Sequence, residues 1–237
     1  MRCLFCIIYS YFRYTGLNGP LADFLNLDRK SGVISLGNQT VFDREKNDFH
    51  FLTVEARDDL GRGNRNTVEL LIRLTDVNDN APVFDQNDYS GFLKENSLDF
   101  EQPVYVSAHD NDENGTENSV IRFKIVQGNL DGNFTIDPVT GELSPNGIVD
   151  FEKVLPDLEG NRVFNLTVQA FDLGTPLLFT NTEVKIFVLD QNDIDPVFEQ
   201  NYYRVSLPED ARSGSEVLTV SALDLDGSAP HNEIVYR

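Results

Sequence analysis

The sequence predicts an all-β protein built from tandem β-sandwiches. Short apolar runs alternate with polar residues at every second position, which is the pattern of half-buried strands. Turn signals containing Gly and Asp separate these runs, and no segment shows a sustained helical period of apolar residues. Related motifs also recur at a constant spacing along the chain. Together these three observations favour a sandwich over a helical or mixed fold.

The spacing between related motifs is 114 residues. It is the same for acidic and amide residues drawn from several different motifs, which indicates a tandem repeat. The residue pairs that show the spacing (190 − 76 = 114, and likewise for the others) are Asp58 and Asp172, Asp76 and Asp190, Glu95 and Glu209, Asp110 and Asp224, and Asn118 and Asn232.

Individual strands follow from the alternation. In "FNLTVQAFD", Leu166, Val168 and Ala170 share one face, and polar residues, beginning with Asn165, share the other. The segments "HFLTVEARDD", "TVELLIRLTD" and "TEVKIFVLD" alternate in the same way. Before them, "LNLDRKSGVI" and "FTIDPVTGEL" predict two strand–turn–strand units, because each has a Gly at the turn.

Composition limits the classes of partner. The chain has 39 acidic and 19 basic residues and a formal charge of −20, which argues against nucleic acid and against anionic membrane surfaces. Cys3 and Cys6 have C-x-x-C spacing but no βαβ setting, so we interpret them as apolar thiols. No stretch approaches the roughly 20 apolar residues of a membrane span, so we expect any membrane anchor outside this sequence.

The acidic residues cluster with Asn in short runs such as "DVNDN" and "DNDEN". Clusters of carboxylate, amide and carbonyl oxygens are what Ca²⁺ prefers, whereas Zn²⁺ prefers Cys or His. The three histidines, His50, His109 and His231, are isolated, and we expect them on the surface or in loops. An EF-hand loop starting at Asp110 fails, because its twelfth position is Ile121 and not Glu.

These motifs together resemble the extracellular cadherin repeat. They are "KEN" or "PED", "DRE" or "DFE", "ARDDLG" or "AFDLGTP", and the connections "LTDVNDNAPVFD" and "VLDQNDIDPVFE". The resemblance spans almost the whole chain and implies seven-stranded Greek-key β-sandwich repeats, one complete and two partial. It also implies Ca²⁺ as the cofactor, with three ions held at each connection by the repeats on both sides. We call Asp76–Asn80 the first linker and Asp190–Ile194 the second linker.

The resemblance implies a ligand set for each linker, carried over residue by residue. For the first linker the ligands are Asp43, Glu45, Asp76, Asn78, Asp79, Asp110, Asp112 and Asp172, with backbone oxygens of Val77, Asn80 and Asn118. For the second linker they are Glu95, Asp150, Glu152, Asp190, Asn192, Asp193, Asp224 and Asp226, with backbone oxygens of Gln191, Ile194 and Asn232. The first set lacks a counterpart of Glu95 and the second a counterpart of Asp172, so we expect neither linker to bind three ions tightly here.

Superposing the copies predicts three domains. Residues 1–80 are a repeat without its N-terminal strand, residues 81–194 are a complete repeat, and residues 195–237 are the first part of a third. In this alignment Ile7–Phe12 corresponds to Val120–Ile125. Because the first copy lacks an edge strand, we expect it to be the least stable part.

The implied function is Ca²⁺-dependent, homophilic cell–cell adhesion by a membrane-anchored glycoprotein on the extracellular side of the plasma membrane. The partners would be other cadherin ectodomains, homophilic or heterophilic, on neighbouring cells. One alternative is a spacer, a tether or a receptor ectodomain for heterophilic signalling. A glycosidase with paired carboxylates would need a single cleft, whereas these acids recur along the chain. The N-x-S/T sequons at Asn38, Asn114, Asn133 and Asn165 fit a secreted surface.

Overall fold

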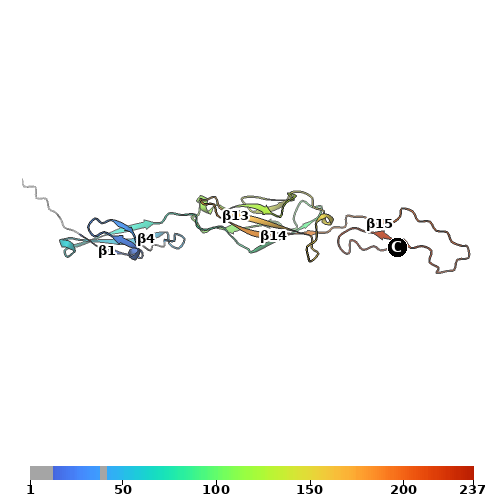
Figure 1. Ribbon diagram of the computed structural model, residues 1–237, viewed down its shortest axis with the longest axis horizontal. Coiled ribbons are helices and arrows are strands. Elements are labelled where there is room, and N and C mark those ends of the chain that lie inside the picture. Colours follow the sequence, from blue (N-terminus) through green and yellow to red (C-terminus); the bar gives the residue numbers. More distant parts are fainter. Residues whose placement is uncertain (1–12, 38–41) are drawn as a thin grey trace, which may run out of the picture. The chain divides into compact units, whose positions relative to one another are not determined.

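A computed structural model describes residues 13–37 and 42–237 (Figure 1). It divides into two compact units, Met1–Val77 and Asn78–Arg237. The described residues form strands joined by turns and short 3-10 helices, which confirms the predicted all-β class. Cys3, Cys6, Asn38 and the predicted strand Ile7–Phe12 lie outside the described residues.

The second unit contains a sandwich of a four-stranded and a three-stranded sheet. In the larger sheet, β7 runs parallel to β14, and the other neighbours are antiparallel. The order in the larger sheet is β10 (Arg122–Gln127), β13 (Val163–Phe171), β14 (Phe179–Leu189) and β7 (Asp88–Lys94). The order in the smaller sheet is β11 (Phe134–Ile136), β12 (Glu142–Pro145) and β8 (Val104–Tyr105). A separate ribbon pairs β6 (Val83–Phe84) with β9 (Ala108–His109).

The core of this sandwich lies on the inner faces of β13 and β14, which run side by side in Figure 1. Leu166, Val168 and Ala170 are buried there, as their alternation predicts, and Asn165 faces outward. From β14, Val184 and the residues two and four positions later complete the layer. Each fully buried aliphatic side chain contributes roughly 1.5–3 kcal/mol, so this layer makes a large contribution to stability.

The predicted strand–turn–strand units are confirmed in both units. In the second, β11 and β12 pair across a turn in which Asp137 accepts hydrogen bonds from the backbone of Val139 and Thr140. Gly141 has φ +72°, and a Cβ there would lie 2.2 Å from the carbonyl oxygen of Val106. In the first unit, β2 (Leu25–Leu27) and β3 (Ile34–Leu36) pair across an equivalent turn. The short 3-10 helices of the described residues lie at Ala22–Phe24 (η1), Asp59–Gly61 (η2), Glu117–Ser119 (η3) and Phe151–Lys153 (η4).

The first unit is an incomplete version of the larger sheet. Its order is β1 (Arg13–Asn18), β4 (Phe49–Arg57) and β5 (Arg65–Arg73), which correspond to β10, β13 and β14. Within residues 13–37 and 42–77, no strand pairs with the outer edge of β5, where β7 would lie in the other sheet. Val68 is consequently 63% exposed, whereas its counterpart Thr182 is 7% exposed.

The predicted alignment of the first strand was wrong by four residues. Arg13 lies opposite Arg57 and Arg122 lies opposite Phe171, so the strands correspond with an offset of 109 (122 − 13) and not the 113 of the prediction. The reason is a longer loop in the second unit. From Asp150 to Asp172 the chain advances 22 positions (172 − 150), against 15 from Asp43 to Asp58 (58 − 43), so one constant offset cannot hold across it. His50, expected on the surface or in a loop, is buried in β4.

The last part of the second unit repeats only the opening ribbon. β15 (Val197–Phe198) pairs with β16 (Ala222–Leu223), and both lie 114 residues after β6 and β9 (197 − 83, 222 − 108). The segment before "PED" forms no strand, since the described chain holds no counterpart of β14 for it to pair with. This ribbon nevertheless brings the loop after β16 close to the second linker.

Candidate metal centre

Carboxylates from four segments meet where β14 ends. Glu95 follows β7, Asp150 and Glu152 belong to the start of η4, Asp190 follows β14, and Asp226 follows β16. Oxygens of Glu95, Asp150 and Glu152 lie within 4.8 Å of one another, and so do oxygens of Glu152, Asp190 and Asp226. Glu152 therefore joins two triads into one continuous acidic centre.

Glu95 holds three of these segments together. Its side chain is fully buried, with one carboxylate oxygen accepting the backbone N–H of Phe151 at 2.8 Å and the other that of Gln191 at 2.7 Å. Burial raises the pKa of Glu95 above its ordinary value, more than these two hydrogen bonds lower it, and the nearby charges of Glu152 and Asp193 add to the rise. A buried carboxylate of this kind costs free energy unless a cation accompanies it.

Asp190 and Asp226 line the other triad. Asp190 accepts hydrogen bonds from the hydroxyl of Ser228 and from Nδ1 of His231. Burial raises the pKa of Asp190. The hydrogen bonds from Ser228 and His231 together lower this pKa by more than burial raises it, so the net shift is downward. Asp226 accepts the backbone N–H of Ile194 at 3.1 Å, which links the loop after β16 to the second linker.

Ser228 and His231 were missed by the sequence reasoning. They lie between the predicted ligands Asp226 and Asn232, but their counterparts in the preceding repeat (228 − 114, 231 − 114) are Asn114 and Glu117. The repeat therefore carries no signal for them. Their position inside the predicted loop was the one available indication.

The oxygens of this centre fit a hard divalent cation. Glu152 Oε1, Asp190 Oδ1 and Asp226 Oδ2 are buried and have no hydrogen-bond donor. Buried polar atoms in proteins are otherwise almost always satisfied. These three oxygens belong to the three side chains of a single triad. Oxygen-only ligands, several of them carboxylates, are the donor set that Ca²⁺ prefers.

The remaining residues predicted for the second linker lie around this centre in different ways. Asp150 accepts a bond from Lys153, whose ammonium lies 2.6 Å away and lowers the pKa of Asp150. Asp224 is buried and accepts the backbone N–H of Asp226. Asp193 accepts a bond from Asn96, and the side chain of Gln191 donates to the carbonyl oxygen of Glu95. The residues Asn192 and Asn232 are exposed, and the predicted role of Gln191, Ile194 and Asn232 rests on their backbone oxygens.

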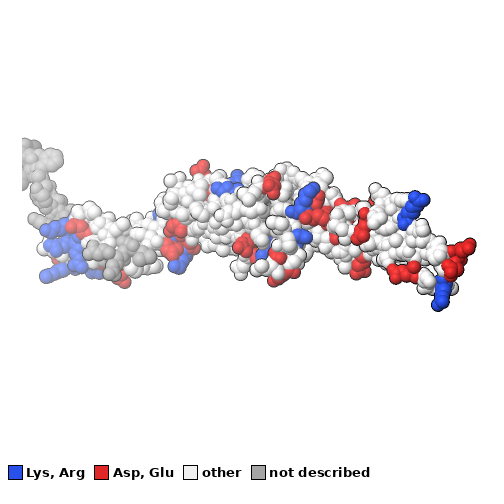
Figure 2. All heavy atoms as spheres, turned by 45° about the vertical axis from the view of Figure 1, so that its right-hand side comes forward, with Lys and Arg blue, Asp and Glu red and all other residues white. Residues whose placement is uncertain are grey.

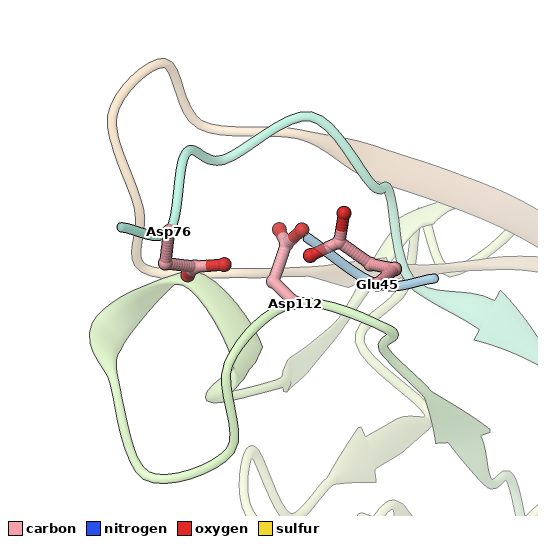
Figure 3. A group of neighbouring side chains, drawn as sticks. All are labelled: Glu45, Asp76 and Asp112. Carbon is pink, nitrogen blue, oxygen red and sulfur yellow. The ribbon is translucent and has the colours of Figure 1, made fainter. Parts of the chain in front are cut away.

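The first unit contributes Asp43, Glu45 and Asp76 to the set predicted for the first linker. Figure 3 shows Glu45 and Asp76; Asp112, drawn in the same view, belongs to the second unit. Arg44 pairs with both Glu45 and Asp76. Its Nε lies 2.7 Å from Asp76, and a terminal nitrogen lies 3.0 Å from Glu45. Asp43 pairs with Lys46 at 2.6 Å. Arg44 corresponds to Phe151 in the next repeat, so here a cationic side chain partly neutralises the carboxylates.

The second unit contributes a separate group from the same predicted set. Asp172 is buried and accepts the backbone N–H groups of Gly174 and Leu178. Asp112 and Asn78 are buried, and Asp112 Oδ2 and Asn78 Oδ1 have no hydrogen-bond partner. Asp79 accepts a hydrogen bond from the side chain of Asn80, and Asp110 accepts the backbone N–H of Asp112. Asn118 lies in η3. The last member of the predicted set, Val77, belongs to the first unit and is exposed. As at the second linker, some oxygens of this group accept backbone hydrogen bonds and others are buried without a partner.

Acidic side chains gather in groups on the face of the molecule drawn in Figure 2. Figure 2 shows their atoms (red) gathered in groups separated by uncharged stretches, with basic atoms (blue) between some of them. This clustering agrees with the runs in the sequence. Within the described residues, none of the helices has the length and apolar character needed to cross a membrane.

Comparison with known proteins agrees with the fold and the motifs. The family model of the cadherin domain matches residues 89–189. The chain is 38% identical over 228 residues to human "Cadherin-related family member 2", covering 96% of this chain and 17% of that protein. It is 34% identical over 219 residues to human "Protocadherin Fat 1", covering 92% of this chain and 4% of that protein. The chain thus spans less than a fifth of the length of these relatives.

Solved structures show the same relationship. The "Crystal Structure of Mouse Cadherin-23 EC22-24" has a TM-score of 0.73 and 26% sequence identity, and the match covers 93% of this chain and 67% of that one. These homologues are adhesion ectodomains and not enzymes. The sandwich, the acidic linkers and these matches agree, and the chain belongs to the cadherin superfamily.

Proposed function

We propose that this chain is part of an ectodomain that mediates Ca²⁺-dependent, homophilic cell–cell adhesion, with Ca²⁺ stiffening the joints between its repeats. The family supports an extracellular adhesive role. In this proposal residues 1–80, 81–194 and 195–237 belong to three successive repeats. The partners are cadherin ectodomains on neighbouring cells, and the chain lies outside the plasma membrane, held by an anchor elsewhere in the protein.

The observation that carries the calcium part is the set of three unsatisfied oxygens on Glu152, Asp190 and Asp226. These residues come from η4, from the second linker and from the loop after β16. A bound Ca²⁺ would supply the positive charge that offsets their repulsion. Because Glu152 precedes the linker and Asp226 follows it, holding both at one point restricts rotation about the linker.

Different observations favour Ca²⁺ binding at the first linker. Its residues repeat the types found in the second at a spacing of 114 (190 − 76), and each unit by itself holds its share of them. Asp112 Oδ2 and Asn78 Oδ1 are buried without partners, as Glu152 Oε1 is at the second linker. The same chemistry therefore supports a second Ca²⁺ centre there.

Titration of the chelator-treated chain with Ca²⁺ tests the calcium part. We expect saturable heat of binding, a rise in melting temperature and a longer, stiffer particle by small-angle scattering at millimolar Ca²⁺. Mg²⁺ at the same concentration should do less, because it holds its waters and prefers octahedral geometry. Binding without any change in scattering would contradict the stiffening role.

Adhesion needs its own measurement. Beads coated with the complete ectodomain that contains this chain should aggregate in Ca²⁺ and disperse in chelator. Mixed populations of differently coloured beads, one of them carrying another cadherin, distinguish homophilic from heterophilic partners. Beads that stay dispersed with Ca²⁺ would contradict adhesion while leaving the metal centre intact.

A further inference from the structure

The longer loop of the second unit builds a surface that the first unit lacks. It runs between η4 and β13, where the chain is seven residues longer (22 positions from Asp150 to Asp172 against 15 from Asp43 to Asp58). Asp157 orders its turn by accepting the backbone N–H groups of Glu159 and Asn161 at 2.9 and 2.8 Å. Leu158 stands at the tip and is fully exposed.

A hollow of about 300 Å³ lies between this loop and the outer face of the β13–β14 pair. Its apolar lining consists of Leu158, Val163 and Phe187, and its polar lining includes Asn161, Asn165 and Lys185. Phe187 stacks on Phe92 with ring centroids 5.5 Å apart, and Phe92 is 47% exposed. A contiguous exposed apolar patch rimmed by polar residues can mark a binding site.

Asn165 opens the sequon Asn165-Leu166-Thr167 and lines this hollow. In an extended strand, residues two positions apart point to the same face, so Asn165 and Thr167 both face outward while Leu166 is buried. We propose that Asn165 carries an N-linked glycan and that its first sugar lies in the hollow against Val163 and Phe187. The proposal does not depend on calcium or on adhesion.

The modification is a glycosyl transfer to the side-chain amide. The amide nitrogen of Asn165 forms a bond to the anomeric carbon of an N-acetylglucosamine carried on a lipid diphosphate. The bond from that carbon to the phosphate oxygen breaks, and its electron pair leaves with the diphosphate. One amide proton passes to a base, so the side chain stays neutral and keeps one N–H.

The lining suits a pyranose ring. Such a ring has an apolar face of C–H groups, which can cover Val163 and Phe187, and polar edges, which can bond to the amide of Asn161 and the ammonium of Lys185. The volume is at the lower end of the range for small-molecule sites, about 300–1,000 Å³, which is appropriate for one sugar with the rest of the chain in solvent. The glycan would then cover the face of β13–β14 next to the loop, so an adhesive surface would have to lie elsewhere.

Asn114 provides a matched control. Its sequon lies in an exposed loop, and Gly115 beside it has no other atom within 4 Å of where a Cβ would be. A glycan on Asn114 would therefore extend into solvent. Its presence or absence should leave the region around Leu158 and Phe187 unchanged.

The experiment uses the full chain secreted from cells that perform N-glycosylation. Peptide mass spectrometry should find the glycan mass on Asn165 and its loss in both Asn165→Gln and Thr167→Ala. Hydrogen exchange of residues 157–163 and 185–189 should be slower in the glycosylated protein than in either variant, and Asn114→Gln should not change it. Thr167→Ala keeps Asn165 itself, so agreement of the two variants assigns the protection to the sugar.

Two results would overturn the inference. An unmodified Asn165 in protein whose Asn114 is glycosylated would show that the site is not used. A modified Asn165 with identical exchange in glycosylated protein and Thr167→Ala would show that the sugar does not occupy the hollow.

Discussion

The carboxylate of Glu95 accepts the backbone N–H of Gln191, a residue 96 positions later in the chain, at 2.7 Å. This bond ties the end of β7 to the first turn of the second linker. The other oxygen of Glu95 binds the N–H of Phe151, so one buried side chain aligns the strand, the linker and η4. The position of Glu152 against Asp190 depends on this alignment.

Replacing Glu95 by Gln should affect the protein more in Ca²⁺ than in chelator. Burial raises the pKa of Glu95, so its charge contributes a destabilising term that grows as pH rises from the unfolded pKa, about 4.3, through the folded pKa. At neutral pH in chelator, Gln removes that charge but turns an NH2 donor towards one of the two backbone N–H groups, so the gain and the loss oppose each other and the melting temperature should change little. In Ca²⁺ a ligand is lost, and affinity should weaken by the order of tenfold.

Calorimetric melting of Glu95→Gln in chelator and in Ca²⁺ checks this prediction. The control is Glu209→Gln, because Glu209 is the exposed counterpart of Glu95. A fall in melting temperature in chelator as large as the fall in Ca²⁺ would count against it.

Asp226→Asn should weaken Ca²⁺ binding at the second linker by the order of tenfold or more, because one charged ligand of the triad becomes neutral. The bond to the N–H of Ile194 can be kept by the amide oxygen, so the fold should survive. Asp195→Asn removes an equal charge from an exposed position beside the linker and serves as the control. Equal Ca²⁺ affinities of the two variants by calorimetry would refute the assignment of Asp226.

Ser228→Ala should lower the free energy of unfolding by about 1–3 kcal/mol at neutral pH in chelator, since Asp190 loses a hydrogen bond to its charged form. The pKa of Asp190 is lowered in the folded state, so this contribution is present above the unfolded pKa of about 3.9 and is lost as pH falls through the folded pKa. The difference from the unmodified protein should therefore shrink below about pH 4.

Denaturant unfolding between neutral and acid pH measures the effect of Ser228→Ala. Ser215→Ala changes an exposed serine in the same part of the chain and should have no effect at any pH. A difference that persists unchanged in acid would assign the loss to packing and not to Asp190.

The first unit should be cleaved by proteases faster than the second. The outer edge of β5 is unpaired within the described residues, and Val68 is far more exposed than Thr182. Local opening is easier where few apolar contacts hold the backbone. Limited proteolysis with mapping of the cuts should place the first ones before Asp76, and equal resistance of residues 81–194 would contradict the expectation.

The number of tightly bound ions tests the ligand sets predicted for the two linkers. Glu95 has no counterpart in the set predicted for the first linker, and Asp172 has none in the set for the second. Calorimetry should therefore count fewer than three tight ions per linker. Six tight ions in the chain would show that the remaining ligands suffice.

The sequence by itself determined the strand class and the buried faces, and it predicted the types of ligand. Alternation placed Leu166, Val168 and Ala170 in the core because a strand points successive side chains to opposite faces. The period of 114 identified Asp76 and Asp190 as equivalent (190 − 76) because a tandem repeat keeps its residues in step. The same period misplaced the first strand, because a constant offset cannot hold where the two repeats have loops of different length.

Only the tertiary structure decided which carboxylate oxygens accept hydrogen bonds and which are buried without a donor. The residues next to Asp190 and Glu152 in the sequence do not indicate that these side chains are buried. Their oxygens lack hydrogen-bond donors because they are buried among residues that are distant in the chain. Ser228 became a partner of Asp190 because the loop after β16 folds against the second linker. Hydrogen bonds and burial depend on distances in space, and the spacing of residues along a chain does not specify them.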